Sequence, residues 1–200
     1  LGMTLMATNA YLHPSILYGK WHDYKGAEMT GAPLFYEEIS ELGATTLDTI
    51  SKEVLAVAKG IMDKTKEDLK NVEHIFDWFM RCYSAEITDK RDLRSAISTN
   101  SAYAGLKHPM KAVEGDNNRL VPDWSNRYFS EDGPYGLAVI RGIAEIAEIP
   151  TPTMDKVLMW MQSKTGKEYI KNGKFEGANV SETRAPQKYG YKNLNQMLGK

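Results

Sequence analysis

Apolar residues recur three or four positions apart along much of the chain, the spacing of helices that bury one face. From Phe35 to about Met62 this pattern predicts a long helix, and Gly43 marks a point where it would bend or divide. A second stripe predicts a helix over residues 67–83, and a short helix is expected over residues 91–98. The stripe of the long helix consists of Ile39, Leu42, Thr46, Ile50, Val54, Val57 and Ile61.

Two further helices are indicated by residues that favour helix ends. One is expected over Pro134–Glu148, with Asp132 in the capping position before it. The other lies in the segment PTPTMDKVLMWMQ, where Thr151 is placed to cap, a proline follows it, and Gly166 suits the end.

The remaining segments are expected to be irregular. Pro14 interrupts the helical pattern of NAYLHPSILYG, because a proline pushes the backbone of the preceding residue, His13, out of the helical region. Residues 99–132 read as a long loop, which is expected to be packed because it carries Tyr103, Leu106, Trp124, Tyr128 and Phe129. A last short helix is expected near residues 193–198. There is no convincing strand alternation and no internal repeat, so we predict an all-α, single-domain fold over residues 1–200.

Composition narrows the class of protein. Charged residues make up 26% and apolar residues 42% of the chain, as in folded globular domains. The formal net charge of −1 provides no basic field for nucleic acid or anionic lipid. The apolar runs are too short to span a membrane, and the N-terminal segment lacks the basic region of a signal peptide, so we expect a cytoplasmic protein. Cys82, the single cysteine, is expected to be a small buried residue.

The sequence contains none of the short patterns that bind phosphate or metal by themselves. It has no glycine-rich dinucleotide loop, no Walker-type loop, no H-E-x-x-H and no C-x-x-C. A nucleotide would therefore need a partner domain. One cysteine and four scattered histidines give no grounds for predicting a metal site.

His13 is the histidine that most favours a chemical role. Its segment is otherwise apolar, so its side chain is either satisfied in the core or directed into a cleft. His74, in the middle of a helix, is expected to be a structural or surface residue. His22 and His108 lie in loop-like segments and are expected on the surface.

A carboxylate and an arginine are candidate partners of His13. Asp132 would fix the imidazole tautomer, and Arg127, five residues earlier, would hold a carboxylate through two parallel hydrogen bonds. Helix capping is the simpler role for Asp132, and a solvated surface position is the simpler role for Arg127. Whether the three side chains meet is left open by the sequence.

Several segments together resemble one protein family. Residues 126–162, NRYFSEDGPYGLAVIRGIAEIAEIPTPTMDKVLMWMQ, look like part of the C-terminal domain of the octopine/nopaline dehydrogenases, the opine dehydrogenases. NAYLHPSILYG, the Phe35-Tyr36 pair after it, NSAYAGLKHP and ETRAPQKYG are similar to further stretches of that domain. The resemblance covers essentially all 200 residues, and the His-Pro segment and the 126–162 block occur in the right order.

The resemblance implies a fold, a reaction and three site residues. The fold would be the helical C-terminal domain of these enzymes, which is like that of 6-phosphogluconate dehydrogenase. The reaction would be the reductive condensation of a 2-oxo acid, such as pyruvate, with the amino group of an amino acid, using NADH or NADPH. The family's catalytic histidine falls on His13, its partner aspartate on Asp132 and its substrate-carboxylate arginine on Arg127.

The resemblance carries further expectations. Trp78, with Phe79 and Tyr83, would wall the amino-acid pocket. The family's N-terminal Rossmann domain, which binds most of the cofactor, is expected to be absent from this chain, so the isolated chain should have no dehydrogenase activity. Gly133 occupies a position where the family commonly has an apolar residue, and we expect it to loosen the placement of Asp132.

Other classes of protein remain open at this point. The main alternative to an enzyme domain is a non-catalytic helical module for binding or dimerisation, and a homodimer is compatible with both. A metal-binding opine system of the metallophore type finds no supporting histidine or cysteine cluster. A large distance between His13 and Asp132 in the folded domain would weigh against the enzyme.

Overall fold

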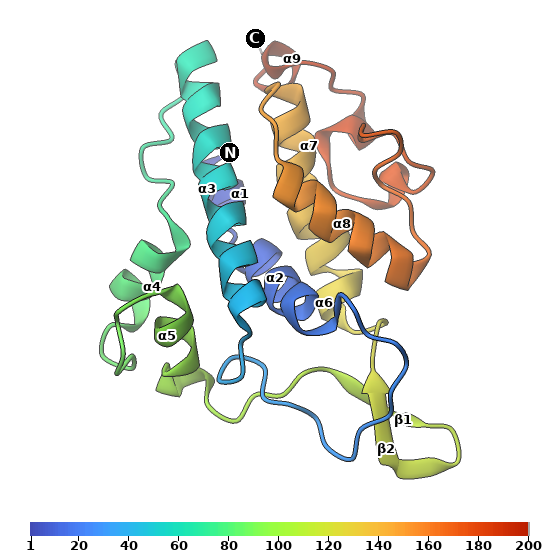
Figure 1. Cartoon of the computed structure of the whole chain (residues 1–200). Coiled ribbons are helices and arrows are strands. Elements are labelled where there is room, and N and C mark those ends of the chain that lie inside the picture. The colour runs from blue at the N-terminus through green and yellow to red at the C-terminus, as the bar shows by residue number, and fades with distance from the viewer. Residues whose placement is uncertain (200) are drawn as a thin grey trace.

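The chain folds as helices packed around one long central helix (Figure 1). The computed structural model describes residues 1–199. The central helix is α3 (Glu41–Lys64), which α2 (Asn9–Trp21) crosses, while α7 (Ala138–Ile146) and α8 (Pro152–Thr165) pack beside them. The other elements are α1 (Gly2–Leu5), α4 (Ile75–Tyr83), α5 (Leu93–Ser98), η1 (Ser101–Tyr103), β1 (Met110–Val113), β2 (Asp116–Pro122), α6 (Arg127–Ser130), η2 (Gly133–Leu137), η3 (Val180–Glu182), η4 (Pro186–Tyr189) and α9 (Leu194–Met197).

The helical fold confirms the predicted class, but the long helix begins later than its apolar pattern suggested. The Ser40 side chain accepts a hydrogen bond from the Gly43 backbone N–H at 3.0 Å, and the helix starts at Glu41. This cap satisfies an N–H group that has no partner within the helix. Gly43 lies in the first turn and does not divide the helix. Phe35 and Tyr36 consequently lie in the segment before α3, where their side chains are free to reach other elements.

The prediction that His13-Pro14 breaks the first helix was wrong, because α2 runs through Pro14 without interruption. Ten of its 13 residues are buried. A proline inside a helix costs about 3 kcal/mol, whereas burial of one large apolar side chain stabilises the fold by roughly 1.5–3 kcal/mol. Burial along the whole of α2 therefore outweighs the local cost.

α4 is shorter than the predicted helix over residues 67–83. The His74 side chain accepts a hydrogen bond from the Phe76 N–H at 3.2 Å and caps α4, so His74 is not in the middle of a helix. Residues before it follow an irregular path from the end of α3. Cys82 lies in the last turn of α4 and is exposed, which corrects the expectation of burial.

A β-hairpin occupies part of the segment that was predicted to lack strands. β1 and β2 pair antiparallel, with Met110 opposite Pro122 and an irregularity after Ala112, and Gly115 makes the turn with a φ of 84°. Neither strand alternates cleanly between buried and exposed positions, which is why the sequence showed no period of two. Of the aromatic and apolar residues expected to pack this region, Leu106 is exposed.

The start of α8 is capped by a side chain from α3 rather than by Thr151. The buried Glu53 carboxylate accepts hydrogen bonds from the backbone N–H groups of Thr153 at 2.7 Å and Met154 at 3.0 Å. A carboxylate is favoured there by the helix dipole as well as by these bonds. The other end agrees with the prediction, since Gly166 ends α8 in the left-handed conformation.

Charged side chains tie the C-terminal segment to α7 and α8. Arg141 is 6% exposed and pairs with Glu145 and Asp155, and it donates to the Gly173 carbonyl at 3.1 Å. Glu145 also accepts from the Phe175 N–H at 2.9 Å. Because a buried charge is costly without partners, this network fixes where residues 171–175 lie.

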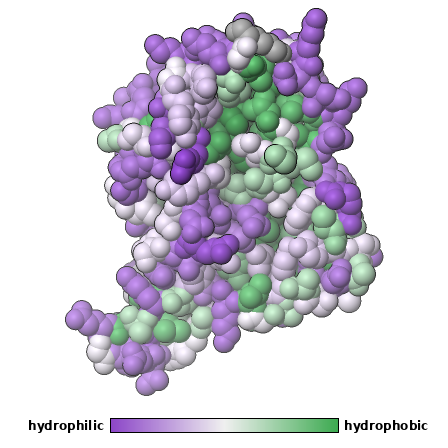
Figure 2. Space-filling model, turned by 180° about the vertical axis from the view of Figure 1, so that it is seen from behind, coloured by the Kyte–Doolittle hydropathy of each residue, from purple (hydrophilic) through white to green (hydrophobic). Residues whose placement is uncertain are grey.

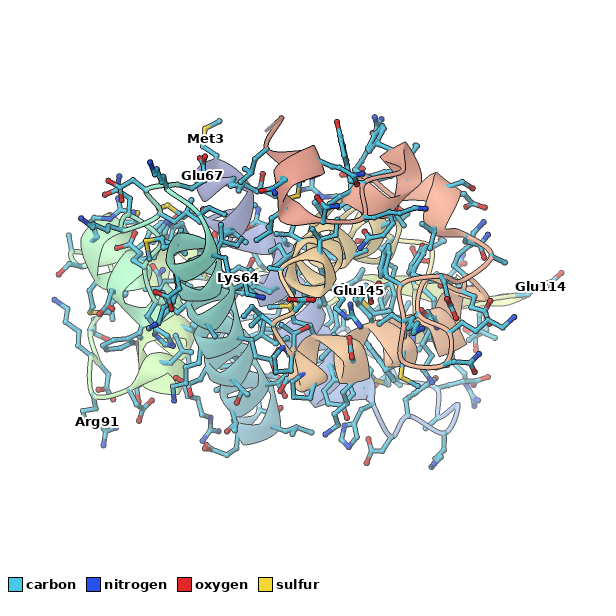
Figure 3. All side chains as sticks on the ribbon, turned by 90° about the horizontal axis from the view of Figure 1, so that it is seen from above. Met3, Lys64, Glu67, Arg91, Glu114 and Glu145 are labelled. Atoms are coloured by element: carbon cyan, nitrogen blue, oxygen red, sulfur yellow. The ribbon has the colours of Figure 1, made fainter. Side chains whose placement is uncertain are left out.

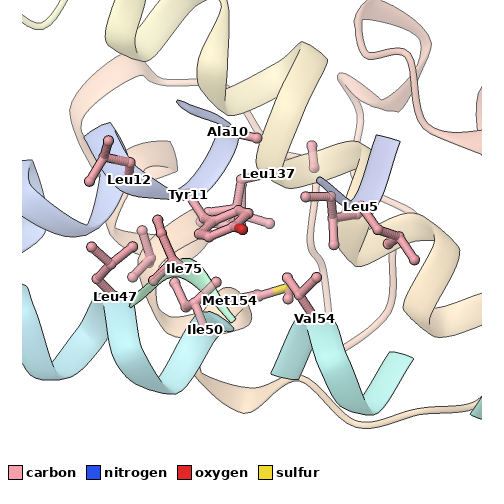
Figure 4. Packing of buried hydrophobic residues seen from close by; sticks show 14 of the residues in the cluster. Leu5, Ala10, Tyr11, Leu12, Leu47, Ile50, Val54, Ile75, Leu137 and Met154 are labelled. Carbon is pink, nitrogen blue, oxygen red and sulfur yellow. The ribbon is translucent and has the colours of Figure 1, made fainter. Parts of the chain in front are cut away.

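One hydrophobic core joins α1, α2, α3, α4, η2 and α8, and Figure 4 shows part of it around Tyr11. In Figure 3, Lys64 near the end of α3 lies beside α7, while Arg91 and Glu114 mark opposite ends of the molecule. Polar side chains cover most of the face shown in Figure 2, apart from an apolar region in its upper part. No helix within residues 1–199 combines the length and apolar character needed to cross a membrane.

Candidate active site

His13 and Asp132 are in direct contact, although 119 positions separate them in the chain. The Nδ1 atom of His13 lies 2.8 Å from an Asp132 carboxylate oxygen. His13 is 4% exposed and Asp132 is half-buried. Asp132 makes no side-chain capping bond to the helical segment after it, so the capping role considered for it is not the one observed.

Two glycines let the backbone around Asp132 approach its neighbours. Asp132 precedes η2, a π-helical segment of the kind that is frequent at functional sites. A Cβ atom on Gly136 would lie 2.8 Å from the Ala10 side chain of α2, so only glycine permits this approach. Gly133 is buried, and a Cβ atom there would lie 2.9 Å from Met161. The effect of Gly133 on the placement of Asp132 stays a prediction.

Aromatic side chains enclose the remaining surface of His13. The Tyr36 hydroxyl oxygen lies 2.9 Å from Nε2 of His13, and the Tyr128 ring stacks on the imidazole with centroids 4.1 Å apart. Phe35 contacts the imidazole edge at a centroid distance of 5.7 Å. Both imidazole nitrogens therefore have a side-chain partner.

A pocket of about 610 Å³ opens beside His13. Arg127 of α6 is exposed on its lining, and it is the one Lys, Arg, Asp or Glu side chain among the described residues that line it. No carboxylate within residues 1–199 forms an ion pair with Arg127. The guanidinium is therefore available to an anionic ligand, which it can grip with parallel hydrogen bonds. The other lining residues are Met6, Ala7, Thr8, Asn9, His13, Tyr36, Trp78, Tyr83, Tyr103 and Tyr128.

The aromatic side chains that line the pocket form its aromatic wall. They agree in part with the prediction that Trp78, Phe79 and Tyr83 wall the pocket. Trp78 and Tyr83 line the pocket, whereas Phe79 is fully buried behind Trp78, with ring centroids 5.1 Å apart. Tyr103, in η1, stacks on Tyr36 at 4.3 Å and continues the wall.

The surroundings of the site raise the pKa values of Tyr36 and Tyr128. Burial raises the pKa of Tyr36, electrostatic interactions with Tyr128, Asp132 and Tyr83 add to the effect, and Arg127 opposes it. Burial also raises the pKa of Tyr128, which Arg127 partly offsets. These hydroxyls therefore stay protonated over the physiological range and act as hydrogen-bond donors.

His108 packs against Phe35 beside the site, and the prediction that it lies on the surface was wrong. It is 3% exposed, accepts a hydrogen bond from the Trp21 indole N–H at 3.1 Å, and packs against Phe35 at 4.6 Å. Burial, with a smaller contribution from Lys20, lowers the pKa of His108 to about 3. His22 is exposed, as expected. Within residues 1–199 no group of three or more His, Cys, Asp or Glu side chains is placed to hold a metal ion.

Sequence reasoning found His13, Asp132, Arg127 and Trp78, and the structure brings all four to this pocket or its edge. Their roles stay predictions. No role was predicted for Tyr36 from the sequence, where only the Phe35-Tyr36 pair in the family resemblance pointed to this residue.

A helical fold of this kind with its site on one face is that of the helical domain of NAD- or NADP-dependent dehydrogenases. Residues 1–165 match the family model described as "NAD/NADP octopine/nopaline dehydrogenase, alpha-helical domain". The chain belongs to this family.

Relatives and solved structures agree with the assignment. Tauropine dehydrogenase of Arabella iricolor is 47% identical over 200 residues, which are 99% of this chain and 50% of the relative. Octopine dehydrogenase of Mizuhopecten yessoensis is 41% identical over 195 residues, 97% of this chain and 48% of the relative. The structure of an octopine dehydrogenase with NADH and L-arginine has a TM-score of 0.93 and 42% identity, over 100% of this chain and 49% of that one. A structure of octopine dehydrogenase with NADH and pyruvate gives a TM-score of 0.88 at 40% identity, over 100% of this chain and 48% of that one. The chain spans about half the length of the curated relatives it matches.

Proposed function

We propose that this chain is the substrate-binding and catalytic domain of an opine dehydrogenase. The reaction is the reductive condensation of a 2-oxo acid, such as pyruvate, with the amino group of an amino acid. Read in reverse, it is the oxidation of a CH–NH bond. The observation that carries the proposal is the 2.8 Å contact of His13 with Asp132 at the edge of a pocket that also presents Arg127.

The residues fit a nicotinamide cofactor in part. Bound NADH or NADPH supplies the hydride that reduces the imine. This chain contributes what such a reduction requires of the protein around the substrate, namely a protonatable imidazole and an arginine for a carboxylate. Residues 1–199 contain no glycine-rich strand-turn-helix for a pyrophosphate. We assign that task to a Rossmann domain outside the chain, and we expect the isolated chain to be inactive.

Arg127 holds the oxo acid. Among the described residues that line the pocket, its exposed guanidinium is the free cation, and a carboxylate bound to it would leave the adjacent carbonyl carbon in a fixed orientation. Trp78 and the tyrosines of the wall offer an apolar surface for the amine substrate.

His13 supplies the proton that leaves with the carbonyl oxygen. An ionised Asp132 can only accept a hydrogen bond, so the proton on Nδ1 of His13 points toward it. This contact fixes the tautomer and stabilises the imidazolium form. Nε2 is then the nitrogen that gives and takes protons during condensation.

The non-catalytic alternative has no comparable support. A helical module for binding or dimerisation has no need of a buried histidine bonded to a carboxylate beside an arginine without an ion-pair partner among the described residues. Burying polar groups costs free energy that a purely structural domain avoids.

The test uses the full-length protein, assayed with pyruvate, a panel of amino acids and NADH or NADPH. We expect His13→Ala to lower kcat by about 10²- to 10⁴-fold without unfolding the domain. His22→Ala, which removes an exposed histidine at the end of the same helix, should leave kcat unchanged. Arg127→Lys should mainly raise the KM for the oxo acid, because lysine cannot form the planar two-bond contact. Unchanged turnover in His13→Ala would exclude the catalytic assignment.

A further inference from the structure

The nitrogen of His13 that must exchange protons with the substrate is already covered. Nδ1 contacts Asp132, and Nε2 lies 2.9 Å from the Tyr36 hydroxyl. Tyr128 stacks on the imidazole ring, Phe35 contacts it in an edge arrangement, and His13 is 4% exposed. A substrate oxygen cannot occupy the same in-plane position at Nε2 as the Tyr36 oxygen.

The hydrogen-bond directions follow from the carboxylate. Because ionised Asp132 accepts from Nδ1–H, the neutral imidazole has a lone pair on Nε2, and the Tyr36 O–H donates to it. When His13 is protonated, Nε2–H donates to the Tyr36 oxygen instead, and the tyrosine proton is free to turn toward another acceptor. Tyr36 lines the pocket together with Arg127, so the pocket offers that acceptor a place.

We propose that the Tyr36 hydroxyl touches the substrate oxygen and passes a proton to it, and that His13 replaces that proton through Nε2. This inference rests on the proposed function and extends it. Tyr36 is then a catalytic residue, His13 its proton source and Asp132 the group that holds the imidazolium.

The proton transfer takes place as the carbinolamine, the adduct of the amine and the oxo acid, loses water. The carbon–oxygen bond of the adduct breaks, and the departing hydroxyl takes the proton of Tyr36 and leaves as water. Tyr36 takes the Nε2 proton of the imidazolium, so His13 ends neutral with its Nδ1–H still bonded to Asp132. The nitrogen lone pair forms the C=N bond, and the positive charge passes from His13 to the iminium group.

The surroundings of Tyr36 favour a relay over a stored negative charge. Burial raises the pKa of Tyr36, and electrostatic interactions with Tyr128 and Asp132 add to the effect. The phenolate is therefore disfavoured, and loss of the tyrosine proton must coincide with its replacement by His13. Stacking on Tyr103 at 4.3 Å and edge contact with Phe35 at 4.8 Å hold the phenol ring in place for this exchange.

The experiment compares Tyr36→Phe with the wild type in the full-length enzyme. Phenylalanine keeps the ring stack and removes only the hydroxyl. We expect kcat to fall by about 10²-fold, with little change in the KM for pyruvate. Tyr11→Phe is the matched control, because Tyr11 is a buried tyrosine of α2 that does not line the pocket, and its kcat should equal that of the wild type.

Single-turnover rates in mixtures of H₂O and D₂O supply a readout that a structural role would not move. Two protons shift together in the relay, so the wild-type rate should depend on the deuterium fraction along a curve, and the Tyr36→Phe rate along a straight line. A straight line for the wild type would overturn the relay even if the variant failed to fold.

Two other outcomes would also overturn it. An unchanged or higher kcat in Tyr36→Phe would mean that the hydroxyl merely covers Nε2, and a raised KM with normal kcat would mean that it only binds substrate. Neither outcome would touch the proposed function, whose failure is recognised separately by the absence of opine formation in the wild type.

Discussion

Lowering the pH should destabilise the fold through His108. This side chain is 3% exposed between Trp21 and Phe35, and burial lowers its pKa to about 3 from an ordinary value of 6.5. Between these two values the unfolded chain binds one more proton than the folded chain, so stability falls as the pH falls below 6.5. The slope is about 1.4 kcal/mol per pH unit, and unfolding at pH 5 should be easier than at neutral pH by about 2 kcal/mol.

The assay is urea unfolding of the wild type and of His108→Gln at pH 7.5, 6 and 5. Glutamine can still accept the hydrogen bond of the Trp21 indole but does not titrate, and the fluorescence of Trp21 helps to report the transition. Subtracting the two unfolding free energies at each pH cancels the other titrating groups. The advantage of the wild type should shrink by about 2 kcal/mol between pH 7.5 and 5. A difference that does not change with pH would refute the argument that His108 is held neutral.

Two further substitutions test the packing that positions the site. Gly19→Ala would place a Cβ atom 2.4 Å from the backbone of Gly43, where α2 crosses α3. We expect it to lower the unfolding free energy by about 1–3 kcal/mol, measured by thermal unfolding. The control is Gly31→Ala, whose Cβ atom would meet no atom within 4 Å and which should be nearly neutral in the same experiment. Glu53→Gln keeps one acceptor for the start of α8 but loses the charge, and we expect a loss of about 1–2 kcal/mol by urea unfolding. A stability equal to that of the wild type in Gly19→Ala or in Glu53→Gln would contradict the corresponding assignment.

The elements predicted best are those whose signals are local. Pro152 and Gly166 mark the two ends of α8 in the sequence, and the structure places them in the first turn and in a left-handed C-cap. The stripe of α3 was readable because its residues bury one face, from Ile39 just before the helix to Ile61. Asn193 likewise caps α9, where a last short helix was expected.

The elements predicted badly are those in which distant contacts outweigh local preference. Proline at position 14 would end an isolated helix, but α2 is buried along most of its length and continues. His108 looked like a loop residue because nothing near it in sequence shows that Trp21 and Phe35 enclose it. Met29, outside the β1–β2 hairpin, pairs with Leu120 of β2 in an antiparallel bridge, and no strand pattern predicts this contact.

The site combines both situations. The resemblance to the opine dehydrogenases pointed to His13, Arg127 and Asp132, yet the local pattern favoured capping for the aspartate and left open whether the three side chains meet. The partnership depends on Gly136, because only a residue without a side chain lets η2 approach α2 closely. The contact of His13 with Tyr36 depends on α3 starting at Glu41, since this leaves Tyr36 in the turn before the helix, from which its hydroxyl reaches His13. In a helix that began at Phe35, as the apolar pattern suggested, Tyr36 would be a helical residue. Its hydroxyl would then be removed from Nε2 of His13, the contact on which the proposed proton relay rests.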